Sequence, residues 1–327
     1  MLFNSTKLTL SNTMMIGVIM TICANNWITM WIGMEMVLIS FIPLMNSTKN
    51  SSSSESMVKY FIMQTISSTM FMFSVICMLI GVSMLLNEIM LMTSMIIKMG
   101  SAPFHNWVLM VIESIEYSIV LIFLTILKIP PLTVMYHINS KFLTIPVMMG
   151  LIISSVSCIN QSSMRKTLVF SSIFNLSLML TSITKFNLMF TFLLVYSTNL
   201  MFLTEIFKYM KINYINQIMF NEFSLWMKLN VWINLLSLSG FPPSIGFVTK
   251  LMIIQELISM NQLLLTMILM LSSLLVLLFY TRMAFSSMMI SYSFKKWSIT
   301  IKTKPAHFIM SMSILIFPII LTMKTVF

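Results

Sequence analysis

The sequence predicts an all-α, polytopic membrane protein of about eleven transmembrane helices, in a single transmembrane domain over residues 1–327. Hydrophobic residues make up 58% of the chain and charged residues only 8%, against roughly 25% charged residues in soluble globular proteins. Apolar runs long enough to cross a bilayer, about 20 residues, follow one another along the chain. This composition excludes a soluble protein, and the short gaps between the runs exclude a separate soluble domain.

Each predicted helix is an apolar run with polar residues at both ends. The runs lie at residues 8–24, 27–45, 57–80, 89–110, 115–137, 142–158, 167–184, 187–208, 229–260, 262–285 and 306–324. The run at 229–260 is too long for one simple crossing, so we expect it to be interrupted. The longest polar gaps are 46–56, 209–228 and 286–305.

The basic residues are distributed unequally between the two ends of these helices. One side carries thirteen of them: Lys7, Lys49, Lys59, Arg165, Lys166, Lys208, Lys211, Lys228, Arg282, Lys295, Lys296, Lys302 and Lys304. The other side carries Lys141, Lys185 and Lys324. Basic loops lie on the inner side of a membrane, so the N-terminus is predicted to face inward. The net charge of +11 therefore reflects orientation, and nucleic acid is not an expected partner.

Four ionisable residues lie inside apolar runs: Glu35, Lys98, Lys128 and Lys250. A charge near the bilayer centre costs roughly 2.5 to 3.5 kcal/mol on insertion scales, so chance explains all four poorly. The alternative is snorkelling, in which the ammonium group reaches the headgroups. From the middle of a helix each headgroup layer is about 15 Å away, beyond the reach of Lys128.

Glycines and prolines interrupt the helices next to these lysines. The interruptions are Gly100 and Pro103 after Lys98, Pro130 and Pro131 after Lys128, and Gly240, Pro242 and Pro243 before Lys250. Such breaks free backbone groups that must be satisfied by protein or internal water. We therefore expect water at each lysine, with a simple proline kink as the alternative at any one site.

The first and last of these breaks form a pair. Interrupted hydrophobic segments at corresponding positions of two halves are typical of transporters built from inverted repeats. Five predicted helices separate the two breaks, an odd number that would invert the second half. We predict a first repeat over about 8–137, a second over about 142–285, and a C-terminal helix over about 306–324.

A carboxylate and several amines at membrane depth are suited to proton relay. Burial disfavours the charged form of a lysine or a glutamate, and an opposite charge nearby favours it, so moving one partner switches proton release. Ser171, Ser172 and Asn175 either order water between the sites or form hydrogen bonds between helices. Glu256 either faces the cavity of Lys250 or approaches the membrane surface.

The chain offers no ligand set for a bound redox centre or metal. Its three cysteines and three histidines are scattered, without a CxxC pair: Cys23, Cys77, Cys158, His105, His137 and His307. We predict no cofactor in this chain. A second acid, Glu205, is expected to form an interfacial pair with Lys208.

Five motifs occur in a characteristic order. They are Trp31-Ile-Gly-Met-Glu35-Met, Lys98-Met-Gly-Ser-Ala-Pro-Phe-His105, Asn160-Gln-Ser-Ser-Met-Arg165-Lys166, Phe170-Ser-Ser-Ile and Ser239-Gly-Phe-Pro-Pro-Ser-Ile-Gly-Phe-Val-Thr-Lys250. Together they resemble subunit 2 of the NADH-ubiquinone oxidoreductase (respiratory complex I) family of animal mitochondria, over nearly the whole chain. The amino-acid composition, with many residues favoured by AT-rich codons and only four alanines, is similar to that of an insect mitochondrial gene product.

The resemblance implies an antiporter-like, proton-translocating subunit of a multi-pass membrane arm in the mitochondrial inner membrane, with the N-terminus on the matrix side. By resemblance, Glu35 pairs with Lys98, Lys128 connects onward, and Lys250 lies at the distal part of the channel. NADH, FMN, iron–sulfur clusters and ubiquinone belong to partner subunits. Asn175 stands where a histidine is frequent, which argues against a histidine relay on that helix but leaves the lysine route.

Two other functions use the same residues. The first alternative is a free-standing cation/proton antiporter, and the second is a structural spacer whose buried ions are merely paired. The predicted function is proton translocation coupled to electron transfer in partner subunits, with the lipid bilayer and other membrane-arm subunits of complex I as neighbours.

Overall fold

The computed structural model describes residues 5–46, 51–81, 83–138, 141–220, 225–242 and 244–291. Within these ranges the chain is helical, and its sole β feature is an isolated bridge between Ser163 and Tyr214. The predicted all-α class is therefore confirmed. The predicted C-terminal helix over 306–324 lies outside the described residues, so the number of eleven helices stays a prediction.

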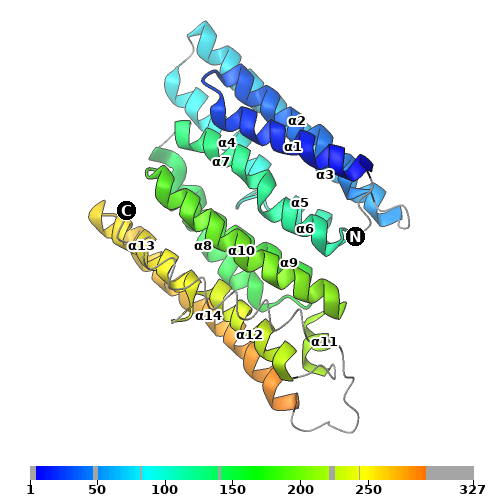
Figure 1. The fold of residues 1–327 in the computed structure, drawn as a ribbon. Helices are drawn as coiled ribbons and strands as arrows, with labels where there is room; N and C mark the ends of the chain where they lie inside the picture. The colour runs from blue at the N-terminus through cyan, green and yellow to red at the C-terminus, as the bar shows by residue number, and fades with distance from the viewer. Residues whose placement is uncertain are drawn as a thin grey trace. The chain divides into compact units, whose positions relative to one another are not determined.

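The helices follow the apolar runs in order (Figure 1). They are α1 Ser5–Cys23, α2 Trp27–Met45, α3 Ser51–Ile80, α4 Met84–Met99, α5 Asn106–Ile112, α6 Tyr117–Leu124, the 3₁₀ helix η1 Ile126–Lys128, α7 Ile129–Ile138, the 3₁₀ helix η2 Lys141–Leu143, α8 Thr144–Ile159, α9 Met164–Thr181, α10 Phe186–Met210, α11 Ile215–Phe220, α12 Leu225–Ser239, α13 Ile245–Ser259 and α14 Leu263–Ser291.

Six stretches of the described chain are long and apolar enough to cross a membrane. They are Ser5–Cys23, Trp27–Met45, Ser51–Ile80, Tyr117–Ile138, Phe186–Met210 and Leu263–Phe285. Many large apolar side chains on them face outward, among them Ile19, Leu79 and Leu271. Such faces are stable in lipid, and the protein is a multi-pass membrane protein.

The chain forms two compact units, Met1–Val147 and Met148–Phe327. In the first unit, α2 contacts α1 and α3, and α7 contacts α1, α2 and α4. Helices α1 and α2 approach closely because Gly17 and Gly33 face each other: a Cβ on either glycine would lie 3.0 Å from the carbonyl oxygen of the other. The first unit thus packs its helices around α2 and α7.

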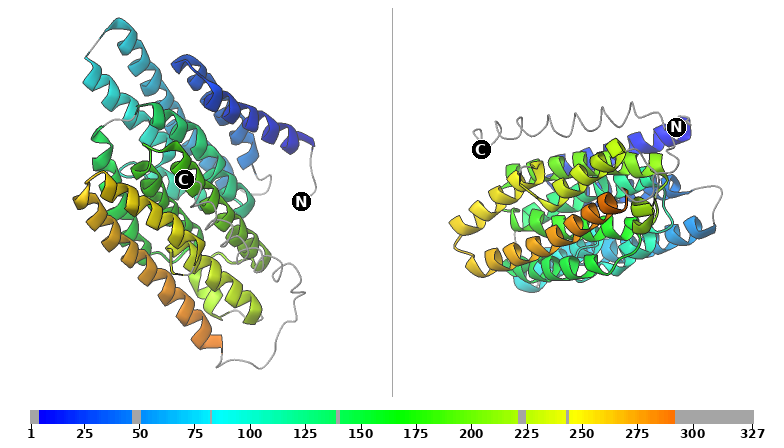
Figure 2. Two further views of the ribbon diagram at one scale, coloured as in Figure 1. Left: turned by 60° about the vertical axis from the view of Figure 1, so that its left-hand side comes forward. Right: turned by 90° about the horizontal axis from the view of Figure 1, so that it is seen from below.

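In the second unit, α13 contacts α9, α10, α12 and α14. Helices α13 and α14, in yellow and orange, run side by side in both views of Figure 2. Helix α13 carries Lys250, which is only 5% exposed. The helix that bears the last predicted site lysine is therefore surrounded by other helices of its own unit.

Both of the paired helix breaks are present, and the helix before each break ends in the same way. At the end of α4, Gly100 has φ 65°, its N–H donates to Ile97 O, and the N–H of Ser101 donates to Ile96 O. At the end of α12, Gly240 has φ 77° and forms the corresponding bond to Ser237 O, with the next N–H bonded to Leu236 O. These are Schellman motifs, in which glycine adopts the left-handed conformation that ends the helix.

The predicted helix over 115–137 is also interrupted. It ends as α6 at Leu124, passes through η1, and restarts as α7. Pro130 and Pro131 lack the N–H groups that would bond to the carbonyls of Ile126 and Leu127, so an α-helical ladder cannot continue there. A 3₁₀ turn replaces it, with the N–H of Lys128 donating to Thr125 O at 3.2 Å.

The polar gap predicted over 209–228 is partly helical. It contains α11, and α12 begins within it at Leu225. Lys228, counted with the basic side, lies in α12 and is only 5% exposed, so it is not a loop residue, while its side of the membrane stays a prediction. Short helices of this kind escape a search for runs of bilayer-crossing length.

Candidate proton-transfer site

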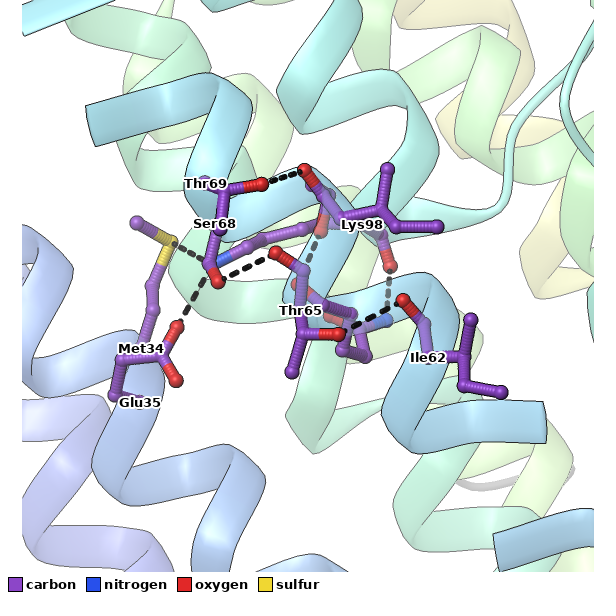
Figure 3. A network of polar contacts seen from close by, with 10 residues as sticks. Met34, Glu35, Ile62, Thr65, Ser68, Thr69 and Lys98 are labelled. Atoms are coloured by element: carbon purple, nitrogen blue, oxygen red, sulfur yellow. Dashed lines mark hydrogen bonds and ion pairs between the residues drawn. The ribbon is translucent and has the colours of Figure 1, made fainter. Parts of the chain in front are cut away.

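Lys98 and Glu35 form an ion pair between α4 and α2. Their Nζ and Oε1 atoms lie 3.8 Å apart, and the side chains are 5% and 20% exposed. The ammonium group also lies 3.7 Å from the sulfur of Met34. Figure 3 shows Lys98 reaching toward both residues of α2. At 3.8 Å the two charges attract each other without a direct hydrogen bond, which leaves each free to bind water.

The break after α4 holds Lys98 in place. Lys98 lies in the last turn of α4, where a positive charge is favoured by the helix dipole. Its carbonyl accepts a hydrogen bond from Gln64 Nε2 of α3 at 3.2 Å. A Cβ on Gly100 would lie 2.1 Å from Val108, so only glycine lets α5 approach this closely. The backbone carbonyl that the break would leave free is thus satisfied by a buried side chain.

Lys98 and Lys128 line the same cavity in the first unit. Its volume is about 30 Å³, which is room for about two water molecules. Its lining includes Tyr60 and Gln64 of α3, Trp107 of α5 and the two prolines of α7. Lys128 is 5% exposed, and its Nζ has no hydrogen bond or ion pair within the described part of the chain. A cavity water is a suitable partner for this amine.

Lys250 is held against the second break. Its Nζ donates a hydrogen bond to the carbonyl of Ser239, at the end of α12, at 2.6 Å. The ring of Phe174 lies 4.9 Å from the same nitrogen, a cation–π distance. A Cβ on Gly240 would lie 2.8 Å from the lysine Cδ, so the glycine makes space for the side chain. The carbonyl freed by this break is therefore satisfied by the lysine itself.

A second, smaller cavity lies beside Lys250. It measures about 10 Å³, close to the volume for a single water, and lies within the second unit. Asn175 of α9, Tyr196 and Asn199 of α10, and Thr249 of α13 line it together with Lys250. Asn175 therefore lies at the lysine site, in the cavity of Lys250.

Ser171 and Ser172 form hydrogen bonds within α9 and also interact with tyrosines of neighbouring helices, Tyr280 of α14 and Tyr196 of α10. The serine hydroxyl groups donate to the carbonyls of Leu168 and Val169 in their own helix, at 2.8 and 2.7 Å. Such bonds to the preceding turn are the ordinary state of serine inside a membrane helix, where no water competes. These two hydroxyls thus donate to the helix backbone.

Two further acids, Glu256 and Glu205, lie in apolar surroundings along the chain. Glu256 is buried at 6% exposure and forms an ion pair with Lys185, which is 58% exposed at the start of α10. Of the two placements considered for Glu256, this pair favours the approach to the membrane surface. Glu205 forms no ion pair within the described residues, so the predicted pair with Lys208 is wrong. Exposed pairs of long side chains contribute little stability, which explains its absence.

The four predicted residues thus fall into two groups, one in each unit. The first unit brings together Glu35, Lys98 and Lys128, and the second places Lys250 with Asn175. The described residues contain no group of three or more His, Cys, Asp or Glu side chains that could hold a metal ion.

Four further residues line the two cavities and were not predicted from the sequence: Tyr60, Gln64, Tyr196 and Asn199. Of these four residues, only Gln64 stands out in the sequence, because it is a long amide inside an apolar run. The other three are ordinary on membrane helices, and only the packing of neighbouring helices shows their position.

The chain matches known proteins over most of its length. Residues 24–276 match the model of the NADH:quinone oxidoreductase/Mrp antiporter transmembrane family. NADH-ubiquinone oxidoreductase chain 2 of Anopheles gambiae is 35% identical over 295 residues, covering 86% of this chain and 85% of that protein. The same chain of Locusta migratoria is 34% identical over 308 residues, covering 91% and 90%.

Solved structures share the fold. A chain of respiratory complex I from Thermus thermophilus with bound aureothin has a TM-score of 0.81 at 15% identity, covering 96% of this chain and 78% of that one. A chain of the Mrp complex from a Dietzia species has a TM-score of 0.75 at 16% identity, covering 84% and 59%. The antiporter-like fold is thus shared with both complexes, while the sequence relatives are more specific. The chain belongs to the NADH-ubiquinone oxidoreductase chain 2 group of the NADH:quinone oxidoreductase/Mrp antiporter family.

Proposed function

We propose that this chain is a proton-translocating membrane-arm subunit of NADH:ubiquinone oxidoreductase in the mitochondrial inner membrane, with its N-terminus on the matrix side. It moves protons outward while partner subunits transfer electrons from NADH to ubiquinone. Those partners hold the FMN, the iron–sulfur clusters and the ubiquinone site. The family match and the insect relatives support the assignment, and the excess of Lys and Arg in the predicted inner loops supports the orientation.

The observation that carries the proposal is the cavity shared by Lys98 and Lys128. Two amines beside a space for about two waters form a proton-transfer unit, because water can pass a proton between groups that do not touch. Glu35, 3.8 Å from Lys98, stabilises the protonated amine while the pair is closed. When Glu35 moves away, Lys98 releases its proton to the cavity.

The remaining roles follow from position. Lys128 accepts charge from the Lys98 side and passes it on laterally. Lys250 exchanges protons with the outer face through the second half of the channel. Its hydrogen bond to Ser239 O and its small cavity support this role, since a neutral or a charged amine can both be accommodated there.

The proposal is tested by replacing the lysines in the assembled oxidoreductase, reconstituted in vesicles. Lys98→Met and Lys250→Met keep side-chain length and remove the titrating group, so we expect assembly and loss of coupled proton pumping. Lys59→Met is the matched control, because Lys59 is 41% exposed in an i,i+4 pair with Glu55. Unchanged pumping in both site variants would refute the roles. Preserved pumping with uncharged residues at all four positions would establish the structural-spacer function instead.

The second candidate function is a free-standing cation/proton antiporter. The fold shared with the Mrp complex of Dietzia is the observation in its favour. It is tested by measuring sodium-driven proton flux in vesicles that contain only the purified chain. Flux from the chain alone would establish the antiporter; we expect none, together with purification of the chain in a large NADH-oxidising assembly.

A further inference from the structure

An ion pair lies at the outer end of the contact between α10 and α13. Lys185 caps the start of α10, and Glu256 lies four residues from the C-terminal cap of α13. The two helices contact each other and run in opposite directions, because the start of one meets the end of the other. The predicted orientation places this end at the outer face, where Lys185 is among the few basic residues.

The same contact leads inward to Lys250. Phe192 and Val195 of α10 line the Lys250 cavity, together with Gly246 and Thr249 of α13. Phe192 lies seven residues past Lys185, and Lys250 lies six residues before Glu256, which is about 10 and 9 Å along the two helix axes. The ion pair and the cavity therefore lie at two depths of one helix contact, with the pair nearer the outer water.

The two partners differ in their surroundings. Glu256 is 6% exposed, whereas the side chain of Lys185 is 58% exposed. A buried carboxylate without a partner is unstable until it gains water or a proton, while an exposed lysine loses little when it turns away. The pair can therefore open by movement of Lys185 alone, and opening draws water to Glu256.

We infer that Lys185 and Glu256 form an outer gate, which must open before Lys250 exchanges protons with the outer face. In the closed state the pair excludes water from the contact between α10 and α13. In the open state water reaches Glu256 and continues to the cavity of Lys250. The inference rests on the proposed outward exchange at Lys250, and it adds two residues that control access to that lysine. Glu256 and Lys185 act as positioning residues.

The test measures access to the Lys250 cavity from the outer face. Val195→Cys places a thiol in the cavity lining, and a small membrane-impermeant methanethiosulfonate is added outside vesicles that hold the assembled oxidoreductase. Labelling of the introduced thiol is followed by mass spectrometry. Adding Glu256→Gln or Lys185→Met should speed labelling by about tenfold or more, because a minor open state of roughly 0.1 to 10% becomes the major one.

Two further variants separate a gate from a structural brace. Reversing the pair, with Lys185→Glu and Glu256→Lys together, should restore slow labelling. Glu205→Gln, on the exposed face of α10, should leave labelling unchanged. Unaltered labelling in both single variants, or fast labelling in the reversed pair, would overturn the gate. Loss of pumping in Lys250→Met is measured in parallel, so failure of the gate and failure of the proposed function are told apart.

Discussion

At the scale of single residues, the first unit stabilises its buried charges in two ways: by an ion pair and by a cavity with room for water. Lys98 has a carboxylate 3.8 Å away and a cavity beside it. Lys128 has the cavity without a counter-ion among the residues that the structure describes. A carboxylate beside a buried amine stabilises the charged form of that amine, so the surroundings of the two lysines differ. Movement of Glu35 away from Lys98 would remove this difference and let the proton pass into the shared cavity.

Replacing Glu35 tests this pairing. Glu35→Gln keeps the shape of the side chain and removes its charge, so Lys98 loses the attraction that stabilises its protonated form. We expect fewer protons pumped per NADH oxidised, with the assembled oxidoreductase still formed. The ratio is measured in reconstituted vesicles, and Glu55→Gln, at an exposed pair on α3, is the control. An unchanged ratio in Glu35→Gln would contradict the role of the pair.

Replacing Gln64 tests how the break beside Lys98 is satisfied. Gln64→Leu leaves the carbonyl of Lys98 without its side-chain donor. An unsatisfied buried acceptor costs about 1 to 3 kcal/mol, so we expect a lower midpoint of thermal unfolding in detergent. Thr69→Val, on the exposed face of the same helix, should change the midpoint much less. Equal midpoints of thermal unfolding for Gln64→Leu and Thr69→Val would contradict a stabilising hydrogen bond from Gln64 to the carbonyl of Lys98.

The charged members of the site could be predicted from the sequence, and the uncharged ones mostly could not. A lysine in an apolar run stands out because insertion disfavours it, which identified Lys98, Lys128 and Lys250. Tyr60 and Asn199 do not stand out, since polar uncharged residues are common in membrane helices. Lys228 was expected in a polar gap but lies in a helix, because α12 begins inside that polar segment. The cavity linings depend on contacts between helices, which no local pattern encodes.

At the scale of helices, glycine and proline predicted where the backbone is interrupted. Gly100 and Gly240 both end a half-helix in a Schellman motif, as their place beside prolines indicates. The order of the residues also predicted which half-helix carries the lysine. Lys98 lies before its break, on α4, and Lys250 lies after its break, on α13. The freed carbonyls are therefore satisfied differently: that of Lys98 accepts a hydrogen bond from Gln64, and that of Ser239 accepts one from the ammonium group of Lys250.

Glycine substitutions test whether glycine is required at the first break, after α4. Gly100→Ala and Gly81→Ala both place a side chain at positive φ, which costs roughly 1 to 2 kcal/mol. A Cβ at Gly81 meets nothing within 4 Å, whereas one at Gly100 would clash with Val108. We expect Gly100→Ala to lower the unfolding midpoint clearly more than Gly81→Ala. Equal effects of the two variants would show that the close approach of α5 is unimportant.

At the scale of the whole molecule, composition and loop charges predict a multi-pass protein with its N-terminus inside. The helical fold and the family agree with the first part. Orientation is tested by single cysteines in the assembled oxidoreductase: Asn25→Cys, in the link between α1 and α2, should react with an impermeant thiol reagent from the outer face. Ser52→Cys, at the start of α3, should react from the matrix face. Reversed labelling would refute the predicted orientation.

The most direct measurement is a density map of the assembled oxidoreductase that resolves ordered water. We predict water in the cavity of the first unit, within hydrogen-bond distance of both Lys98 Nζ and Lys128 Nζ, and a water beside Lys250. A dry cavity, or lysine side chains that extend to the headgroup layer, would contradict proton transfer by this route.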